Sequence, residues 1–377
     1  MNVPRPARPI RIPLIVGLMV GGLLAGACSG GATPTAPAAA TSPAASSGAA
    51  ASGSGATASG SGASAAPSAP ATSTKLTVGL GYIPSVQFAP FYLASQAGYY
   101  RDAGLDVTFQ NGNDADLIRL VGTGAVDIGL ADGTSVIPAV SQGIPVRYVA
   151  TIYARFPNVV LAKTTSGITS AADLKGKKLG TPGKYGSSWI MLQALLSSAG
   201  LTTSDLDIQL YPDYGQGTAL GQGAVQAATG FANNEPVQLG LAGIPTTVLT
   251  VDDIVPLPGN GLIASVSTIS AKHAALAAFV ASTLRAMTEI TADPSKGLDA
   301  SIAVVPDLGK DRATQEAILT ATIVMWSNAY TNADGLGAID SSAWTKTVTF
   351  MAGLPGSPIG GPAPTVDQLI DTSLLTP

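Results

Sequence analysis

A tract of very low complexity divides this chain into two parts that cannot fold in the same way. Residues 29–74 contain only Ser, Gly, Ala, Thr and Pro. Such a composition offers no large apolar side chains for a core, so it predicts a disordered tether. A flexible linker of this length has a root-mean-square span of roughly 35–40 Å. A tether of that span would hold a globular body clear of whatever surface its other end is attached to.

The segment before the tether has the features of an export signal. Its basic start consists of Arg5, Arg8 and Arg11, and an apolar run over residues 13–27 ends in small residues. This run is shorter and richer in glycine than a helix that spans a membrane. Cys28 is the only cysteine of the chain, and it closes the sequence LLAGAC, which resembles a bacterial lipobox.

We therefore expect residues 1–27 to be a signal peptide, Cys28 to carry a lipid, and residues 28–74 to connect the lipid to the body. A stray thiol at Cys28 is the alternative interpretation. The protein is then expected outside the cytoplasm, anchored by lipid to the outer face of the cell membrane.

The remaining residues, 75–377, are enough for two lobes. The formal net charge of the whole chain is -4, and removal of the signal would take away three arginines and no acids. An acidic body lacks the basic patch that nucleic acid or an anionic membrane surface requires, so both are excluded as partners. We expect a first lobe over residues 75–155, a second over 156–262, and a return to the first lobe with a helical tail over 263–377.

Short apolar runs alternate with helical patterns along this body. The predicted strands are residues 75–81, 105–110, 126–131, 146–153, 159–163, 178–180, 208–211, 225–230, 246–249 and 262–269. The predicted helices are residues 86–100, 114–122, 135–142, 187–198 and 235–241, followed by a helix-rich tail over 272–330. This alternation predicts an α/β protein in which each lobe is a mostly parallel sheet flanked by helices.

Catalytic machinery is sparse in this sequence. His273 is the only histidine and lies in an Ala-rich helical pattern. One histidine and one N-terminal cysteine provide no metal cluster and no Cys-His pair, and a Ser-His-Asp set would require His273 to lie in the cleft. Residues 183–188 lack the ending of a phosphate loop, and residues 79–81 lack the third glycine of a dinucleotide fingerprint. We therefore expect a protein that is not an enzyme and has neither a metal nor a cofactor.

Ligands of doubly wound sheets bind beyond the carboxyl ends of the strands, so the loops after the predicted strands are candidate sites. In the first lobe these loops contain Tyr82, Gln87, Phe88, Asp132, Gly133, Tyr153 and Arg155. As alternatives to ligand binding, Phe88 could pack between strand and helix, and Asp132 could cap the next helix. Tyr153 and Arg155 lie where the chain leaves the lobe, so a purely structural hinge role is the alternative for both.

The second lobe carries a stronger signal in the loop before residue 189. Its hydroxyls and rings are Tyr185, Ser187, Ser188 and Trp189, which together offer hydrogen bonds and flat faces to a planar ligand. Tyr214 adds a further ring. Asn233, Asn234 and Glu235 place two amides and a carboxylate at a helix start, of which helix capping by Asn234 explains only one.

Three segments of the body resemble a known family. Residues 98–107 (GYYRDAGLDV), 124–129 (GAVDIG) and 173–180 (DLKGKKLG) are similar to marks of the NMT1/THI5-like binding proteins. This resemblance implies the two-lobed type II periplasmic-binding-protein fold, closing over a small ligand. It also implies that the protein delivers its ligand to the permease and ATPase subunits of an ABC importer. We expect the protein to be a monomer.

Residues 82–92 and 233–239 look most like the vitamin-binding branch of that family. The resemblance favours riboflavin as the transported ligand, rather than as a cofactor, with a thiamine pyrimidine precursor as an alternative. A sulfonate or nitrate is a further alternative, and it would require a cleft arginine, for which Arg155 is the best candidate. Family enzymes that make the thiamine pyrimidine use histidine and a cysteine-rich motif, which this chain lacks.

Overall fold

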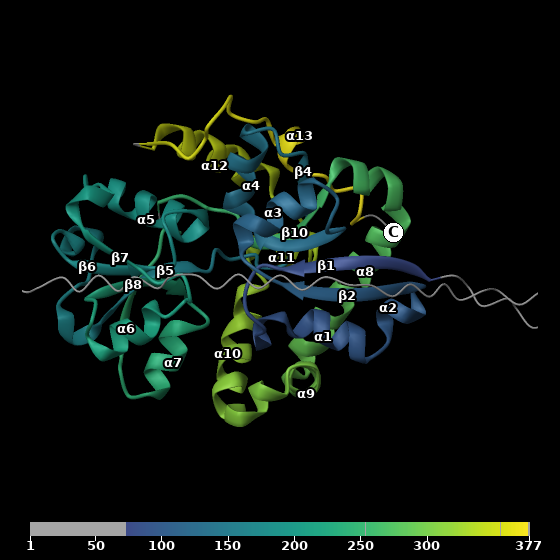
Figure 1. Cartoon of the computed structure of the whole chain (residues 1–377), viewed down its shortest axis with the longest axis horizontal. Coiled ribbons are helices and arrows are strands. Elements are labelled where there is room, and N and C mark those ends of the chain that lie inside the picture. Colours follow the sequence, from purple (N-terminus) through teal and green to yellow (C-terminus); the bar gives the residue numbers. More distant parts are fainter. Residues whose placement is uncertain (1–72, 253, 355, 376–377) are drawn as a thin grey trace, which may run out of the picture. The chain divides into compact units, whose positions relative to one another are not determined.

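The computed structural model describes residues 73–252, 254–354 and 356–375 (Figure 1). The predicted signal peptide, Cys28 and nearly all of the predicted tether lie outside the described residues. Within the described part, the helices do not combine the length and apolar character needed to cross a membrane.

The first sheet contains five strands in the order β2-β1-β3-β10-β4. These are β1 (Thr74–Leu80), β2 (Leu105–Asn111), β3 (Ile128–Asp132), β4 (Val146–Thr151) and β10 (Asn260–Ser265). Strand β1 is parallel to β2 and β3, whereas β10 is antiparallel to both of its neighbours. Strand β3 is buried along its whole length and the edge strand β2 alternates, as expected for a sheet covered on both faces. Helices α3 (Asp114–Gly122) and α4 (Gly133–Ser141) connect its strands.

The second sheet repeats this arrangement, with the order β7-β6-β8-β5-β9. Its strands are β5 (Asn158–Lys163), β6 (Lys178–Thr181), β7 (Asp207–Leu210), β8 (Ala227–Phe231) and β9 (Thr246–Leu249). Its helices are α5 (Gly186–Ser198), α6 (Gln216–Gln222) and α7 (Glu235–Leu241). Strand β5 is the antiparallel member here. The prediction of two mostly parallel sheets flanked by helices is confirmed.

The chain crosses between the two sheets twice. The first crossing joins β4 to β5, and the second joins β9 to β10. The two crossings are tied together, because the backbone N–H groups of Ile152 and Tyr153 both donate to the carbonyl of Asn260, at 3.1 and 2.8 Å. Gly259 allows this approach, since a Cβ there would lie 2.2 Å from the Tyr153 carbonyl oxygen. Strand β10 starts at Asn260, two residues before the predicted lobe boundary at 262.

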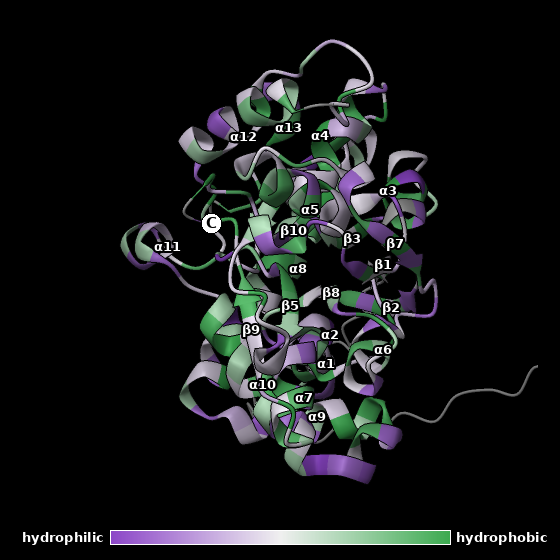
Figure 2. Ribbon diagram, turned by 90° about the vertical axis from the view of Figure 1, so that its left-hand side faces the viewer, coloured by the Kyte–Doolittle hydropathy of each residue, from purple (hydrophilic) through white to green (hydrophobic). Residues whose placement is uncertain are grey.

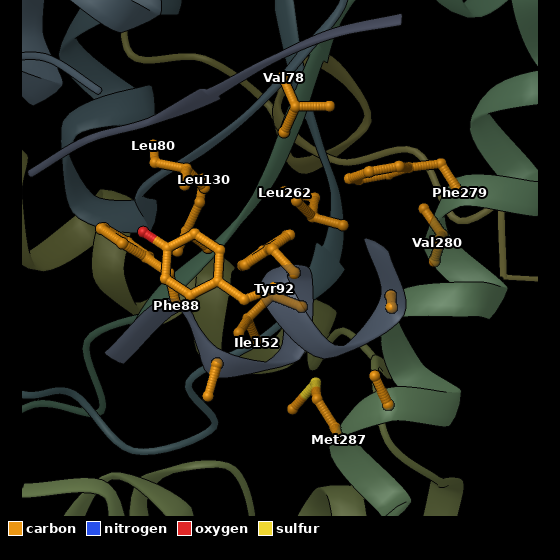
Figure 3. Close-up of a cluster of buried hydrophobic side chains, with 14 of the residues drawn as sticks. Val78, Leu80, Phe88, Tyr92, Leu130, Ile152, Leu262, Phe279, Val280 and Met287 are labelled. Carbon is orange, nitrogen blue, oxygen red and sulfur yellow. The ribbon is translucent and has the colours of Figure 1, made fainter. Parts of the chain in front are cut away.

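The C-terminal helices cover the first lobe. They are α8 (Val266–Ala292), α9 (Pro294–Val304), α10 (Arg312–Met325), α11 (Ala329–Asp334), α12 (Ser341–Gly353) and α13 (Val366–Leu369). Helices α8 and α9 pack on α1 (Ala89–Gln96). Figure 3 shows Phe279, Val280 and Met287 of α8 around the same core as Tyr92 of α1 and Val78 of β1. Hydrophobic and hydrophilic residues are interspersed along α10 and α12 in Figure 2, as expected for helices that bury one face.

Helix α10 reaches beyond the first lobe and packs against α7 of the second. Helix α12 buries Trp344 against the ring of Tyr148 in β4, with ring centroids 4.9 Å apart. The tail is therefore part of the core of the first lobe and also forms one flank of the contact between lobes.

Several predicted elements differ from the structure. The helix expected over 86–100 is divided into a 3-10 turn, α1 and α2 (Tyr99–Asp102), because Gly98 adopts a left-handed conformation with φ of 79°. The strand expected over 262–269 ends at Ser265, whose hydroxyl accepts from the backbone N–H of Thr268 and so starts α8. Strands β3 and β8 begin two residues later than predicted, and β4 ends two residues earlier. Helices α6, α12 and α13 were not predicted.

Candidate ligand-binding site

A pocket lies between the two lobes, at the strand ends where the sequence predicted a site. It is lined by Gly81, Tyr82, Gln87, Phe88, Asn113, Leu130, Asp132, Tyr153, Pro182, Gly183, Tyr185, Gly186, Ser187, Ser188, Tyr214, Gln216, Gly230, Phe231, Asn234, Glu235 and Asn260. Eleven of the fifteen predicted ligand-binding residues are in this lining. Both lobes contribute rings, hydroxyls, amides and a carboxyl group, so the pocket offers flat faces together with hydrogen-bonding groups.

Two tyrosines from opposite lobes meet in the pocket. The rings of Tyr82 and Tyr214 are 4.9 Å apart between centroids and cross at 78°. Burial raises the pKa of Tyr82 far above its usual value, with smaller contributions from Glu235 and Tyr214, and a hydrogen bond with Asn234 opposes this rise. The Tyr82 phenol is therefore neutral at physiological pH and presents a flat apolar face with a polar edge.

Tyr185 stands at the more exposed side of the pocket, with a relative exposure of 46%. Its hydroxyl accepts a hydrogen bond of 3.0 Å from the side-chain amide of Asn113, which belongs to the first lobe. The ring folds over Gly183, where a Cβ would lie 2.1 Å from a ring carbon. A second contact between the lobes is thus made beside the pocket.

A buried hydrogen-bond network joins the lobes through Asp132. Its carboxylate accepts from the hydroxyl of Ser187 and from the side-chain amide of Asn260. Ser187 also accepts from Asn158 at 3.0 Å, and Ser188 donates to Asn158 at 2.6 Å. Burial raises the pKa of Asp132 to about 6, against the lowering effect of the Ser187 and Asn260 hydrogen bonds. The Asp132 side chain makes no capping hydrogen bond to α4, and the hydrogen bonds from Ser187 and Asn260 join it to the other lobe and to β10.

Glu235 is the second carboxyl group of the pocket. It accepts from the backbone N–H of Phe231 at 2.7 Å and from the side-chain amide of Gln216 at 3.4 Å. Gly217 and Gly230 lie so close that a Cβ at either would come within 2.8 Å of the Glu235 side chain. Burial raises the pKa of Glu235 to about 7, so near neutral pH this group is present in both ionised and protonated forms.

Two predicted residues lie just behind the lining. Asn233 is fully buried, and its amide donates to Gln87 at 3.0 Å and to Thr322 of α10 at 2.8 Å. The backbone N–H of Gly133 donates to the carbonyl of Gly259 at 3.1 Å. Both residues therefore support the junction of the lobes and do not line the pocket themselves.

Arg155 and Trp189 are not brought to the pocket. The Arg155 guanidinium donates to the carbonyl of Ser327 at 3.0 Å, which places it on the other side of the crossing, toward the C-terminal helices. Trp189 packs with Leu192 and Leu196 in the core of the second lobe. On α5, residues three and seven positions apart lie on one face, so Trp189 shares the face of the buried Leu192 and Leu196.

Four polar or aromatic lining residues were missed by the sequence analysis, namely Asn113, Gln216, Phe231 and Asn260. Asn113 follows β2, so the rule that pointed to the other strand ends also applies to it. Phe231 is the last residue of β8, and Gln216 begins α6, which had not been predicted. Asn260 belongs to the return crossing, whose path the sequence alone does not fix.

The described lining of the pocket contains acidic side chains but no basic ones. Among the described residues that line it, the ionisable groups are the carboxyls of Asp132 and Glu235 and four tyrosines, with no lysine or arginine. In the described part of the chain no group of three His, Cys, Asp or Glu side chains is arranged to hold a metal ion.

Two equivalent mixed sheets, two crossings and a pocket between the lobes define the periplasmic-binding-protein fold. Solved structures with this fold include the alkanesulfonate-binding protein SsuA from Xanthomonas axonopodis pv. citri, with a TM-score of 0.60 and 17% identity, covering 78% of this chain and 95% of that one. SsuA from Escherichia coli aligns with a TM-score of 0.58 and 17% identity, covering 79% and 92% of the two chains. The fold is thus that of the solute-binding proteins of ABC importers.

The chain belongs to the NMT1/THI5-like family, whose model matches residues 85–297. It is 35% identical over 298 residues to the riboflavin-binding protein RibY of Chloroflexus aurantiacus, covering 77% of this chain and 84% of that relative. A Saccharomyces cerevisiae 4-amino-5-hydroxymethyl-2-methylpyrimidine phosphate synthase, THI11, is 33% identical over 136 residues. This match covers 36% of the present chain and 39% of the yeast enzyme. The family resemblance expected from the sequence is confirmed.

Proposed function

We propose that this protein is the solute-binding component of an ABC importer and that it captures riboflavin in the pocket between its lobes. The observation that carries the proposal is the pocket itself, in which tyrosine rings from both lobes surround amides, hydroxyls and two carboxyl groups. The similarity to RibY over most of both chains supports riboflavin as the ligand.

The lining suits the chemistry of a flavin ring. An isoalloxazine presents two flat faces and an edge of carbonyl and nitrogen atoms, while the ribityl chain carries hydroxyls. Tyr82, Tyr214 and Tyr185 provide rings for the faces. Asn234 and Ser188 provide donors and acceptors for the polar edge.

A thiamine pyrimidine precursor is the second candidate. The partial similarity to the yeast pyrimidine phosphate synthase favours it, and a small aminopyrimidine would use the same rings and amides. We propose it as the alternative ligand of the same importer function.

An anion such as a sulfonate or nitrate is the least favoured ligand. The cleft arginine that it would require is not provided by Arg155. The described lining instead contains two carboxyl groups, which repel an anion.

The protein is proposed to bind its ligand without transforming it. His273 is outside the pocket lining and shares a 3.2 Å hydrogen bond with Ser373. Because the ligand would contact both lobes, it would favour the closed form by binding that form more tightly. The permease and ATPase of the importer would recognise closure. We further propose a monomer attached to the outer face of the membrane through a lipid on Cys28.

Titration of the purified protein with riboflavin tests the proposal. Stacking on tyrosine rings should quench flavin fluorescence. A ligand present at 100 times its dissociation constant should raise the free energy of unfolding by about 2.7 kcal/mol. The pyrimidine precursor and a sulfonate are titrated in parallel by thermal unfolding. If only the pyrimidine stabilises the protein, the pyrimidine and not riboflavin is the ligand. If only the sulfonate does so, the proposal of a vitamin ligand is wrong.

A further inference from the structure

Asp132 places a buried carboxylate at the junction of the two lobes. Its relative exposure is 8%, and its hydrogen bonds from Ser187 and Asn260 come from neutral groups. Tyr148 and Tyr153 interact with it electrostatically, and burial is the main cause that raises their pKa values far above the usual range. Burial raises the pKa of Asp132 itself to about 6, so at pH 7.5 the carboxyl group is still largely ionised.

This carboxylate stands where two helices begin. Asp132 immediately precedes α4, and it accepts from Ser187 in the first turn of α5. The start of a helix favours a negative charge, and ligand anions often bind at such positions. Here a side chain of the protein itself supplies the negative charge. A ligand anion entering this part of the pocket would therefore meet a like charge.

We propose that Asp132 sets the charge selectivity of the pocket, admitting the neutral form of a flat ring ligand and rejecting its phosphorylated form. The inference rests on the proposed function, because it takes the natural ligand to be a neutral ring compound. Glu235 adds a second negative group, but its carboxylate is held within its own lobe by Phe231 and Gln216. Asp132 is the carboxylate that faces both lobes, so it is assigned the larger effect.

Riboflavin and riboflavin 5′-phosphate are the probes, because they share the ring and differ in one charged group. The measured quantity is the ratio of their dissociation constants at pH 7.5 and fixed ionic strength, obtained by fluorescence quenching. Asp132→Asn removes the charge and preserves the shape. Its amide can donate to the Ser187 hydroxyl while its carbonyl still accepts from Asn260, since a hydroxyl both donates and accepts. Asp132→Ser is a second variant without the carboxylate.

Two further variants are matched controls. Ser187→Ala breaks the same contact between the lobes but keeps the carboxylate, so it separates loss of the hydrogen bond from loss of the charge. Asp106→Asn removes one negative charge at an exposed position of β2, outside the pocket lining.

The wild-type protein should prefer riboflavin over its phosphate by at least a hundredfold, because like charges brought together across a binding site are strongly unfavourable. Both Asp132 variants should lower this ratio at least tenfold, whereas Ser187→Ala and Asp106→Asn should preserve it. An unchanged ratio in both Asp132 variants, or equal wild-type affinity for the two flavins, overturns the inference and leaves the proposed function intact. If riboflavin does not bind, the same ratio is measured with the hydroxymethyl pyrimidine and its phosphate. Failure of the wild-type protein to bind either neutral compound would overturn both proposals.

Discussion

The ring of Tyr82 in the first lobe meets the ring of Tyr214 in the second lobe edge to face, with centroids 4.9 Å apart. Tyr214 is held there in a left-handed backbone conformation, with φ of 61°. This conformation costs a residue with a side chain about 1–2 kcal/mol. Strain of this kind is found at functional sites more often than elsewhere, which agrees with a pocket formed at this contact.

Removal of the Tyr82 ring should weaken flavin binding. Tyr82→Leu is expected to raise the dissociation constant for riboflavin about two- to tenfold, because an aromatic pair contributes about 0.5–1.5 kcal/mol beyond the area that it buries. Tyr82→Phe keeps the ring and loses only the hydroxyl that bonds to Asn234. The loss of riboflavin affinity should therefore be smaller for Tyr82→Phe than for Tyr82→Leu. Fluorescence titration of both variants gives the comparison, and equal losses would show that the hydroxyl contributes more than the ring.

The hydrogen bond from Asn113 to Tyr185 should slow the escape of ligand. Tyr185→Phe removes a contact between the lobes worth about 0.5–1.5 kcal/mol. The dissociation rate constant should therefore rise about two- to tenfold, with little change in the association rate constant. Stopped-flow fluorescence measures both. Tyr211→Phe, in the same lobe but outside the pocket lining, is the matched control, and an equal effect there would rule out a specific role for the contact.

Glu235 should make the stability of the unliganded protein depend on pH. Its folded-state pKa is about 7, above the ordinary value of 4.5. The folded state therefore holds this proton more tightly than the unfolded state does. The resulting stabilisation is fully present below about pH 4.5 and is lost as the pH rises through about 7.

Glu235→Gln mimics the protonated form and should remove this part of the pH dependence, which is of the order of 3 kcal/mol. Denaturant unfolding of the wild type and the variant between pH 4 and 8 measures the difference. Two profiles that stay parallel across that range would show that the pKa of Glu235 is not raised in the folded state.

Gly259 should be essential to the second crossing. A Cβ at this position would lie 2.2 and 2.8 Å from the backbone carbonyl oxygens of Tyr153 and Arg155. A backbone carbonyl cannot relieve this clash by a rotamer change, as a flexible side chain could. Gly259→Ala should lower the free energy of unfolding by about 1–3 kcal/mol or more. Gly240→Ala in α7 is the control, because nothing lies within 4 Å of its new Cβ, and it should be neutral or stabilising. Similar losses at both glycines would contradict this account of the crossing.

The position of the pocket could be predicted because it follows from a local rule. Tyr82 and Tyr185 come soon after a strand and Asp132 is the last residue of one, and parallel strands bring their carboxyl ends to one edge of a sheet. The same rule, applied to the loop after β2, would also have found Asn113.

Predicting which side chains point away from the pocket would have required information from distant parts of the chain. Ser188 lines the pocket while the next residue, Trp189, packs in the core, because successive helical residues point about 100° apart. The start of α5, which sets this phase, depends on a left-handed Gly186. Arg155 is drawn to the opposite side by a carbonyl 172 positions later in the chain. No pattern within one segment could have predicted that contact.

The place of β10 in the first sheet has a consequence for the order in which the protein can fold. Strands β3 and β4 do not pair with each other, because β10 lies between them. A chain that emerges from its amino end can therefore complete the second lobe before the first. Until residue 265 has emerged, the first sheet has a gap where β10 will insert. Strand β10 then fills that gap, and its first residue accepts hydrogen bonds from the other crossing. Helices α8 to α13 can pack on the completed first sheet only after this step.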